Sequence, residues 1–127
     1  MKAAPDDLPN RRPVWEALSD LFLYTDVTLA RTWRAEKLAA SPYSLADIEQ
    51  ILIDEVYPVC KYNLVCVAGE WEFFDPDWLE NRILNRLKSP LRGLHWLNAG
   101  RFWVPRCEEW QATKTTIISI RESSNSA

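Results

Sequence analysis

The chain of 127 residues has the length of one ordinary domain and can bury a single hydrophobic core. Its composition, 47% hydrophobic and 26% charged residues, is typical of globular proteins and excludes intrinsic disorder. No apolar stretch approaches the roughly 18 residues of a membrane span, and the first residues lack the apolar core of a signal peptide. The three cysteines, an odd number, favour a reducing compartment. We therefore expect a cytoplasmic protein with one domain over 1–127, flexible at 1–10 and 123–127.

Prolines mark the expected beginnings of helices, because proline is favoured in the first helical turn and disfavoured in helix interiors. Pro13, Pro58, Pro76 and Pro90 each open a segment whose apolar residues recur every three or four positions. The first of these segments predicts a helix from Pro13 to about Tyr24, with one face toward the core.

The second and third expected helices differ in how much apolar surface they offer. The second ends near Ala40 and has a thin apolar stripe of Leu29, Trp33 and Ala40 among many charged residues, so we expect it to be peripheral. The third begins at Ser44, whose side chain can cap it, and its apolar face extends to Val56.

The rest of the chain predicts four more helices, in which apolar residues again share one face. Asp75 is the expected N-cap of the clearest of them, because a carboxylate there accepts hydrogen bonds from the first turn. Gly69 is expected to end the helix over 59–68, and Gly100 is expected to interrupt the helical pattern after the helix over 90–98. These helices cover residues 59–68, 75–87, 90–98 and 108–121. The whole pattern predicts an all-α, compact single-domain bundle of about six to seven short helices.

Residues that common catalytic and cofactor motifs require are scarce. One histidine, His95, cannot form a paired-histidine zinc site, and three scattered glycines form neither a dinucleotide fingerprint nor a phosphate loop. Cys60, Cys66 and Cys107 could join His95 around a metal, but they lack C-x-x-C spacing and are better interpreted as small core residues. We therefore expect no metal, no cofactor and no catalysis.

Neighbouring carboxylates leave a small hydrolase open as an alternative, because two carboxylates can do acid and base work when burial separates their pKa values. The alternative is structural. Asp77 and Glu108 lie at expected helix starts, which favour a carboxylate, and the other carboxylates are expected on solvent-exposed helix faces. The pairs are Asp54 with Glu55, Glu70 with Glu72, Asp75 with Asp77, and Glu108 with Glu109.

The segment 70–78 combines four aromatic rings and four acidic side chains in nine residues. Aromatic anchors supply contact area and surrounding acids steer a basic partner, which is the composition of an interaction surface. The alternative is that the rings fill the core while the acids cap a helix, because a small domain with seven tryptophans must bury most of them. The candidate partner-binding residues are Glu70, Trp71, Glu72, Phe74, Asp75, Asp77 and Trp78.

A second charged segment, 82–106, holds six basic residues and no acid, interleaved with aromatic rings. Such a pattern could bind single-stranded nucleic acid by phosphate attraction and stacking, so a nucleic-acid-binding regulator is an alternative function. Internal pairing with the preceding acidic segment is the favoured interpretation, since the chain has a net charge of −3 and the segment has a leucine stripe for the core.

Five stretches of the chain resemble a family of small, uncharacterised bacterial proteins, and together they cover nearly the whole chain. They are RRPVWEALSDLFL at 11–23, SPYSLADIEQIL at 41–52, NLVCVAGEW at 63–71, DPDWL at 75–79 and EWQATK at 109–114. Tyr24 departs from the pattern, which would place an acid there. The resemblance implies no established activity, so no functional residue carries over from it.

A compact, mildly acidic domain without catalytic motifs predicts a protein-binding module. We expect a bacterial immunity-type inhibitor that neutralises a cognate toxin by occluding its active site, through steric block and charge complementarity. Nucleic acid and membrane partners are not expected, and the sequence does not indicate an oligomeric state.

Overall fold

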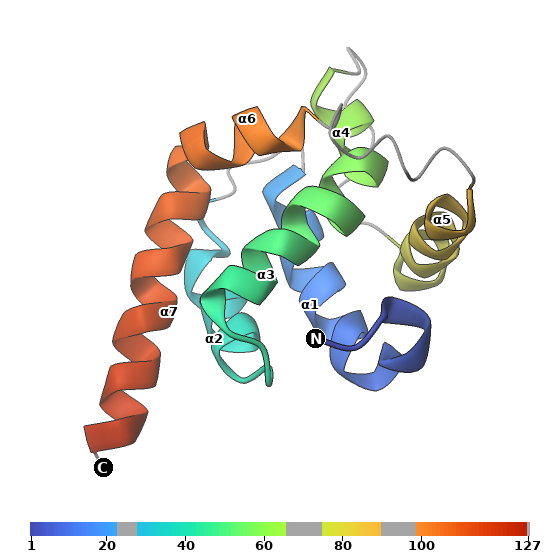
Figure 1. The fold of residues 1–127 in the computed structure, drawn as a ribbon. Helices are drawn as coiled ribbons and strands as arrows, with labels where there is room; N and C mark the ends of the chain where they lie inside the picture. Colours follow the sequence, from blue (N-terminus) through green and yellow to red (C-terminus); the bar gives the residue numbers. More distant parts are fainter. Residues whose placement is uncertain (23–27, 66–74, 90–98, 127) are drawn as a thin grey trace.

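The structure, a computed structural model, describes residues 1–22, 28–65, 75–89 and 99–126. In these ranges the chain forms seven α-helices and no strand, which confirms the predicted all-α class (Figure 1). The helices are α1 Leu8–Ser19, α2 Arg31–Ala39, α3 Leu45–Ile51, α4 Tyr57–Val65, α5 Pro76–Lys88, α6 Gly100–Arg106 and α7 Glu108–Ser126. Shorter elements are the 3-10 turns η1 Ala4–Asp6 and η2 Asp20–Phe22, and the π-helical segment η3 Leu52–Val56 between α3 and α4.

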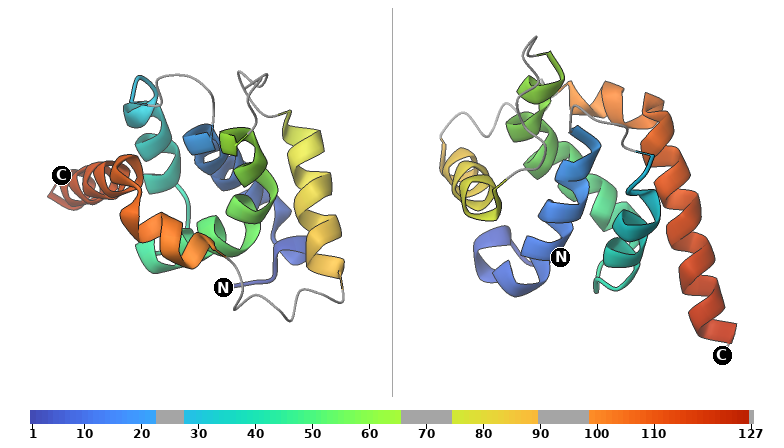
Figure 2. Two further views of the ribbon diagram at one scale, coloured as in Figure 1. Left: turned by 90° about the horizontal axis from the view of Figure 1, so that it is seen from above. Right: turned by 180° about the vertical axis from the view of Figure 1, so that it is seen from behind.

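The helices surround one core, with α5 and α7 on opposite sides of the central helices α1 and α3 (Figures 1 and 2). Helix α2 packs against both α1 and α7, and the C-terminal half of α7 extends beyond the other helices. All seven α-helices contribute buried hydrophobic side chains, so the core is shared by the whole described chain. Its largest members include Trp15, Leu18, Phe22, Leu38, Ile48, Ile51, Leu79, Ile83, Val104 and Trp110. None of the described helices is both long and apolar enough to span a membrane.

Two helix starts agree with the sequence prediction in atomic detail. The Ser44 side chain accepts a hydrogen bond from the Asp47 backbone N–H at 3.1 Å, which caps α3. The Asp75 carboxylate accepts hydrogen bonds from the backbone N–H groups of Asp77 (2.8 Å) and Trp78 (3.1 Å), which caps α5. Both caps satisfy amide groups that have no partner within their own helix.

The predicted start of the first helix at Pro13 is wrong, because α1 already begins at Leu8 and Pro13 lies inside it. Pro9 occupies the first turn, where a proline is well tolerated. Pro13 itself is exposed on the helix surface. Because Pro13 has no N–H, the carbonyl four residues earlier lacks its usual helical donor. That carbonyl lies near the start of the helix, where solvent can provide the hydrogen bond.

Pro58 also fails to begin a helix, since α4 continues without a break from α3 through η3. A proline cannot donate to the carbonyl four residues earlier, which here belongs to Asp54. Arg86 Nη1 donates to this carbonyl at 2.9 Å. The turn just before the proline is π-helical, and in it the Tyr57 N–H bonds the Leu52 carbonyl five residues earlier. A side chain from α5 thus replaces the hydrogen bond that the proline cannot make.

Helix α2 is not peripheral as predicted, because its buried face centres on a charged residue. Leu29 and Trp33 of the predicted stripe are 85% and 40% exposed, whereas Arg34 is fully buried. The Arg34 guanidinium donates to Asp20 at 2.7 Å, to Glu109 at 2.6 Å and to the Thr113 hydroxyl at 3.1 Å. These bonds tie α2 to η2 and α7, and a hydropathy pattern cannot reveal them.

The C-terminal helices also differ from the prediction at their ends. The predicted helix over 90–98 lies outside the described residues, and Gly100 begins α6 where an interruption was expected. Helix α7 continues past Arg121 to Ser126. The Arg121 guanidinium donates to the carbonyls of Leu38, Ala39, Ser41 and Tyr43, which satisfies groups at the end of α2 and in the following turn.

Candidate functional site

The predicted acidic and aromatic residues fall into two groups. Asp75, Asp77 and Trp78 form the first turn of α5, while Glu70, Trp71, Glu72 and Phe74 lie outside the described residues. The Asp75 carboxylate is used as a cap, and the Asp77 side chain is 87% exposed. Trp78 packs partly against the core, and the Arg82 guanidinium lies 5.5 Å from the centre of its ring. The structure therefore places two of the predicted carboxylates at the surface, beside a largely structural tryptophan.

A groove of about 230 Å³ lies between α1 and the start of α5. Its exposed edge carries charged side chains and prolines, and buried apolar side chains form its floor. We call it the acidic groove, lined by Arg12, Pro13, Trp15, Glu16, Pro76, Asp77 and Leu79.

Charges around the acidic groove are unequal. Arg12 is held by Glu80, with Nε 3.0 Å from one carboxylate oxygen and Nη2 bonded to the other. Its distance to Asp77 is longer, at 3.8 Å. Glu16 is exposed on the next turn of α1. Three carboxylates thus accompany one guanidinium, and two of them, Glu16 and Asp77, face solvent at the edge of the groove.

An apolar floor with carboxylates at its edge suits a lysine or arginine side chain. The methylene groups of such a side chain can pack on apolar surface while its charged end stays near solvent. The ammonium or guanidinium group would then bond to carboxylate oxygens, and such charge-assisted bonds are stronger than neutral ones. The geometry of the acidic groove therefore favours recognition of a basic group.

Three described arginines of the basic segment 82–106 contact other groups of the same chain. Arg82 lies over the Trp78 ring, Arg86 bonds the Asp54 carbonyl, and Arg106 donates to the Phe102 carbonyl at 2.8 Å. The aromatic ring of Trp103 packs against two core rings, Phe22 at 5.0 Å and Tyr57 at 5.4 Å. Arg92, His95 and Trp96 lie outside the described residues. Pairing of these arginines with the acidic residues Glu70 and Glu72 stays a prediction, because both lie outside the described residues.

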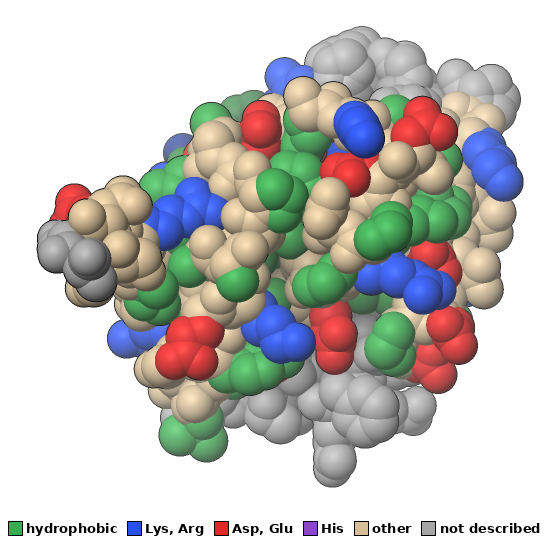
Figure 3. Space-filling model, turned by 90° about the horizontal axis from the view of Figure 1, so that it is seen from below, with side chains coloured by type: hydrophobic (Ala, Val, Ile, Leu, Met, Phe, Trp, Pro, Cys, Tyr) green, Lys and Arg blue, Asp and Glu red, His purple; other side chains and the backbone are tan. Residues whose placement is uncertain are grey.

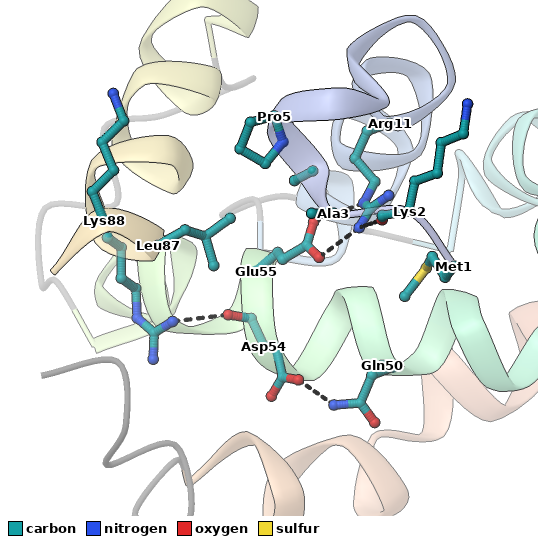
Figure 4. Close-up of a pocket in the computed structure, with 12 residues that line it drawn as sticks. Met1, Lys2, Ala3, Pro5, Arg11, Gln50, Asp54, Glu55, Leu87 and Lys88 are labelled. Atoms are coloured by element: carbon teal, nitrogen blue, oxygen red, sulfur yellow. Dashed lines mark hydrogen bonds and ion pairs between the residues drawn. The ribbon is translucent and has the colours of Figure 1, made fainter. Parts of the chain in front are cut away.

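A larger cavity, of about 540 Å³, was not expected from the sequence (Figure 4). It lies between the N-terminal residues 1–5, the start of α1, the region of η3 and the end of α5. We call it the N-terminal cavity. The sequence signal was partial: Asp54 and Glu55 were noted as a carboxylate pair, but nothing local to them indicated which distant segments would complete a cavity.

One wall of the N-terminal cavity contains a buried ion pair. Arg11, 2% exposed, donates to both carboxylate oxygens of Glu55, at 2.9 and 3.1 Å. The Trp15 indole N–H donates to the same carboxylate at 2.8 Å. The oxygens of Glu55 are therefore occupied by structural hydrogen bonds, so the Asp54 and Glu55 pair does not have the shared, open arrangement that a two-carboxylate hydrolase requires.

The same ion pair extends into a buried phenol and carboxylate. Arg11 also contacts Asp7 at 3.4 Å, the Tyr43 hydroxyl at 3.2 Å and the Lys2 carbonyl at 3.0 Å. The Tyr43 hydroxyl donates to Asp7, and this bond holds the pKa of Asp7 below its ordinary value. Burial, together with the bond to Asp7, raises the pKa of Tyr43. The network fixes the N-terminal segment against α1 and η3.

The model of a domain of unknown function, DUF7079, matches residues 9–116 of the chain. The chain belongs to the DUF7079 family. This agrees with the resemblance of its sequence stretches to an uncharacterised family. The matched range contains the whole acidic groove, whereas residues 1–5 of the N-terminal cavity precede it. No curated protein and no solved structure matches the chain.

Proposed function

We propose that this DUF7079 protein is a non-catalytic protein-binding module whose acidic groove receives a basic side chain of its partner. The observation that carries the proposal is the pairing of an apolar floor, Trp15 and Leu79, with solvent-facing carboxylates at the edge, Glu16 and Asp77. Arg12 is already bound to Glu80, so it does not fully neutralise these carboxylates.

The walls of the groove support this function because they belong to rigid elements. Helices α1 and α5 pack on each other, and Leu79 and Ile83 anchor α5 in the core. The cap at Asp75 fixes the first turn of α5, which carries Asp77. A preformed surface loses little conformational freedom on binding, and this favours affinity.

The surface outside the acidic groove carries charges of both signs, so the carboxylates gathered at the groove matter for selecting a partner. Figure 3 shows one face of the molecule, on which acidic and basic side chains are interspersed among hydrophobic ones. On such a surface, selection of a basic partner depends on local groups of like charge. The acidic groove is such a group, and its carboxylates would accelerate association with a basic partner.

The specific role we propose is that of a bacterial, cytoplasmic immunity-type inhibitor. Its partner would be a cognate toxin with a basic, nuclease-like cleft, which the protein would cover without chemical turnover. Charge complementarity around the acidic groove and the lack of a recognised catalytic motif in the sequence support this role.

The partner can be identified by photo-crosslinking from inside the groove. A photoreactive amino acid replaces Glu16 in one variant, and Thr115, exposed on α7 at the opposite side of the molecule, in a control variant. The proposal predicts a protein partner that crosslinks from position 16 and not from position 115. Equal crosslinking from both positions, or none from position 16, contradicts it.

Association kinetics with that partner test the role of charge. Asp77→Lys should lower the association rate constant by about tenfold at low ionic strength, with a smaller effect at high salt. The matched control is Glu36→Lys, which makes the same charge change at an exposed position on α2. An association rate that Asp77→Lys leaves unchanged, or that both variants lower equally, would refute the assignment of the groove.

A further inference from the structure

The side of α2 that points away from the core carries large apolar side chains. Leu29, in the turn just before α2, and Trp33 are 85% and 40% exposed, whereas Arg34 on the opposite side is fully buried. Positions 29, 33, 36 and 40 are spaced by four, three and four residues, which places them on one side of a helix. We call this surface the outer stripe of α2. Its members, all exposed, are Leu29, Trp33, Glu36 and Ala40.

The outer stripe reverses the usual pattern of a surface helix. Such a helix turns its largest apolar residues toward the core and its arginines toward solvent. In α2 the buried side consists of Arg34, Ala35 and Leu38. The bonds of Arg34 to η2 and α7 hold α2 in the orientation that presents Leu29 and Trp33 to solvent. Single exposed apolar residues are common on protein surfaces, but an apolar stripe held outward by a buried ion network indicates a binding surface.

A groove of about 420 Å³ adjoins one end of the outer stripe. Seen from behind, α2 lies beside α7, and the C-terminal end of α7 extends beyond it (Figure 2). The apolar part of the groove comes from Ala39 and Ala40 at the end of α2 and from Ile120 on α7. An apolar side chain that packs on the end of the outer stripe would therefore enter this groove.

Two copies of the outer stripe complement each other when their α2 helices run antiparallel. A two-fold axis midway between positions 34 and 35 pairs position 29 with position 40 of the second copy, and position 33 with position 36. Leu29 of one copy would then pack on the small Ala40 of the other and enter its groove. The Trp33 indole N–H would donate to the Glu36 carboxylate of the second copy. Within the described ranges neither of these two groups is hydrogen-bonded to protein.

The charges of this surface also suit a second copy. Glu36 and its neighbour Lys37 carry opposite charges, so two copies do not repel each other. The Lys37 ammonium lies 5.8 Å from the centre of the Trp33 ring. Because Glu36 meets the Trp33 ring of the other copy, it also approaches the Lys37 that covers that ring. Opposite charges thus come together twice across the two-fold axis.

We propose that the protein forms a homodimer through the outer stripe, with the two α2 helices antiparallel. Such a contact uses the same surface of both copies and closes after two. One short helix makes a smaller interface than the roughly 1,200–2,000 Å² of stable complexes, so we expect a reversible dimer at high micromolar concentration. The dimer does not depend on the proposed partner, because the acidic groove shares no lining residue with the outer stripe. Association rates measured on dilute protein lie far below this concentration, so Glu36 remains a valid control there.

Sedimentation equilibrium of the full-length protein, from low micromolar to millimolar concentration, tests for the dimer. Wild type should change from monomer to dimer over this range. Leu29→Lys should raise the dissociation constant at least tenfold, because a charged group would replace the side chain that enters the groove. The control, Phe102→Lys, makes a similar change at a side chain of α6 that is 66% exposed and should alter the constant less than twofold. Circular dichroism checks the fold of both variants. A monomer at every concentration, or equal effects of the two variants, overturns the proposal.

Photo-crosslinking tests the antiparallel arrangement. Protein with a photoreactive amino acid at position 29 is mixed at millimolar concentration with isotope-labelled wild type, so that mass spectrometry separates crosslinks between copies from those within one copy. The proposal predicts crosslinks to the labelled peptide that contains Ala39 and Ala40. Crosslinks mainly to labelled residues near position 29 would show parallel helices and contradict the proposal. Crosslinks to other parts of the labelled copy, or none between copies, would show that the outer stripe does not receive a second copy.

Discussion

The ion pair between Arg11 and Glu55 gives the sharpest prediction for stability, because it lies inside the core. Glu55→Ala removes both bonds to Arg11 and the acceptor of the Trp15 indole, while Arg11 stays 2% exposed. Breaking a buried pair on one side costs about 3–5 kcal/mol. Asp7 at 3.4 Å still offers partial compensation, so we expect a loss near the lower value, about 3 kcal/mol. Small domains have a total stability of about 5–15 kcal/mol, so the loss is a large fraction of it.

Urea unfolding, followed by tryptophan fluorescence and far-UV circular dichroism, measures this loss. With a typical dependence of about 1–3 kcal/mol per molar urea, a loss of about 3 kcal/mol lowers the midpoint by about 1–3 M. Glu36→Ala, at an exposed position of α2, is the control and should leave the midpoint nearly unchanged. A loss below about 1 kcal/mol for Glu55→Ala, the value of a surface pair, would refute the reasoning.

A double replacement separates the cost of an unpaired charge from the value of the pair. Arg11→Met combined with Glu55→Leu removes both charges of the pair at once, while the buried Asp7 loses Arg11 but keeps its hydrogen bonds from Tyr43 and Asn10. We expect the double variant to lose less stability than the sum of the two single variants, because the partners interact directly. Additive losses would show that the two side chains act independently.

Three further predictions concern other parts of the fold. Hydrogen bonds from Arg31 hold the pKa of Glu109 below its ordinary value of 4.5, so this stabilisation is complete above about pH 4.5 and is lost as the pH falls through the lower folded-state pKa. Melting temperatures from pH 7 to pH 2 should fall in the acid range, and Glu109→Gln should make that fall shallower; an unchanged slope would contradict the assignment. Burial raises the pKa of the Cys60 thiol, so iodoacetamide at pH 8 should leave Cys60 unmodified in native protein and modify it in urea, as read by peptide mass spectrometry. Arg86→Leu removes the donor to the Asp54 carbonyl and should cost about 1–3 kcal/mol in urea unfolding, whereas no loss would show that Pro58 needs no such compensation.

Local sequence signals predicted those features that depend on neighbouring residues. Ser44 and Asp75 were recognised as caps because a helix start is decided within a few positions of the chain. The all-α class followed from apolar spacing in the same way. In α7, a run with strand propensity over 115–120 became helix, because packing of Trp110 and Ile117 in the core outweighs local propensity.

The errors arose where a distant side chain decides the local structure. Pro58 was predicted to begin a helix, but Arg86, 28 positions later in the chain, bonds the carbonyl that the proline leaves without a donor. The many charged residues of the second helix predicted a peripheral position, but acids from η2 and α7 allow one of them, Arg34, to be buried. Hydropathy assigns every arginine to solvent, so the roles of Arg34 and Arg86 could not be found from their own neighbourhoods.

The candidate site was predictable to a similar, limited extent. Asp77 was predicted from the density of acids and rings around it, and its solvent exposure makes it available to a partner. The contribution of Glu16 was missed, because it comes from α1, some sixty positions earlier. A groove between two helices depends on how they pack, and no local pattern encodes that.

The most direct measurement is the association rate of the protein with the partner crosslinked at position 16, for wild type, Asp77→Lys and Glu36→Lys. Recognition of a basic group by the acidic groove requires a large decrease at low salt for Asp77→Lys and almost none for Glu36→Lys. Identical rates for all three proteins would contradict it, because carboxylates that face the partner must affect its approach.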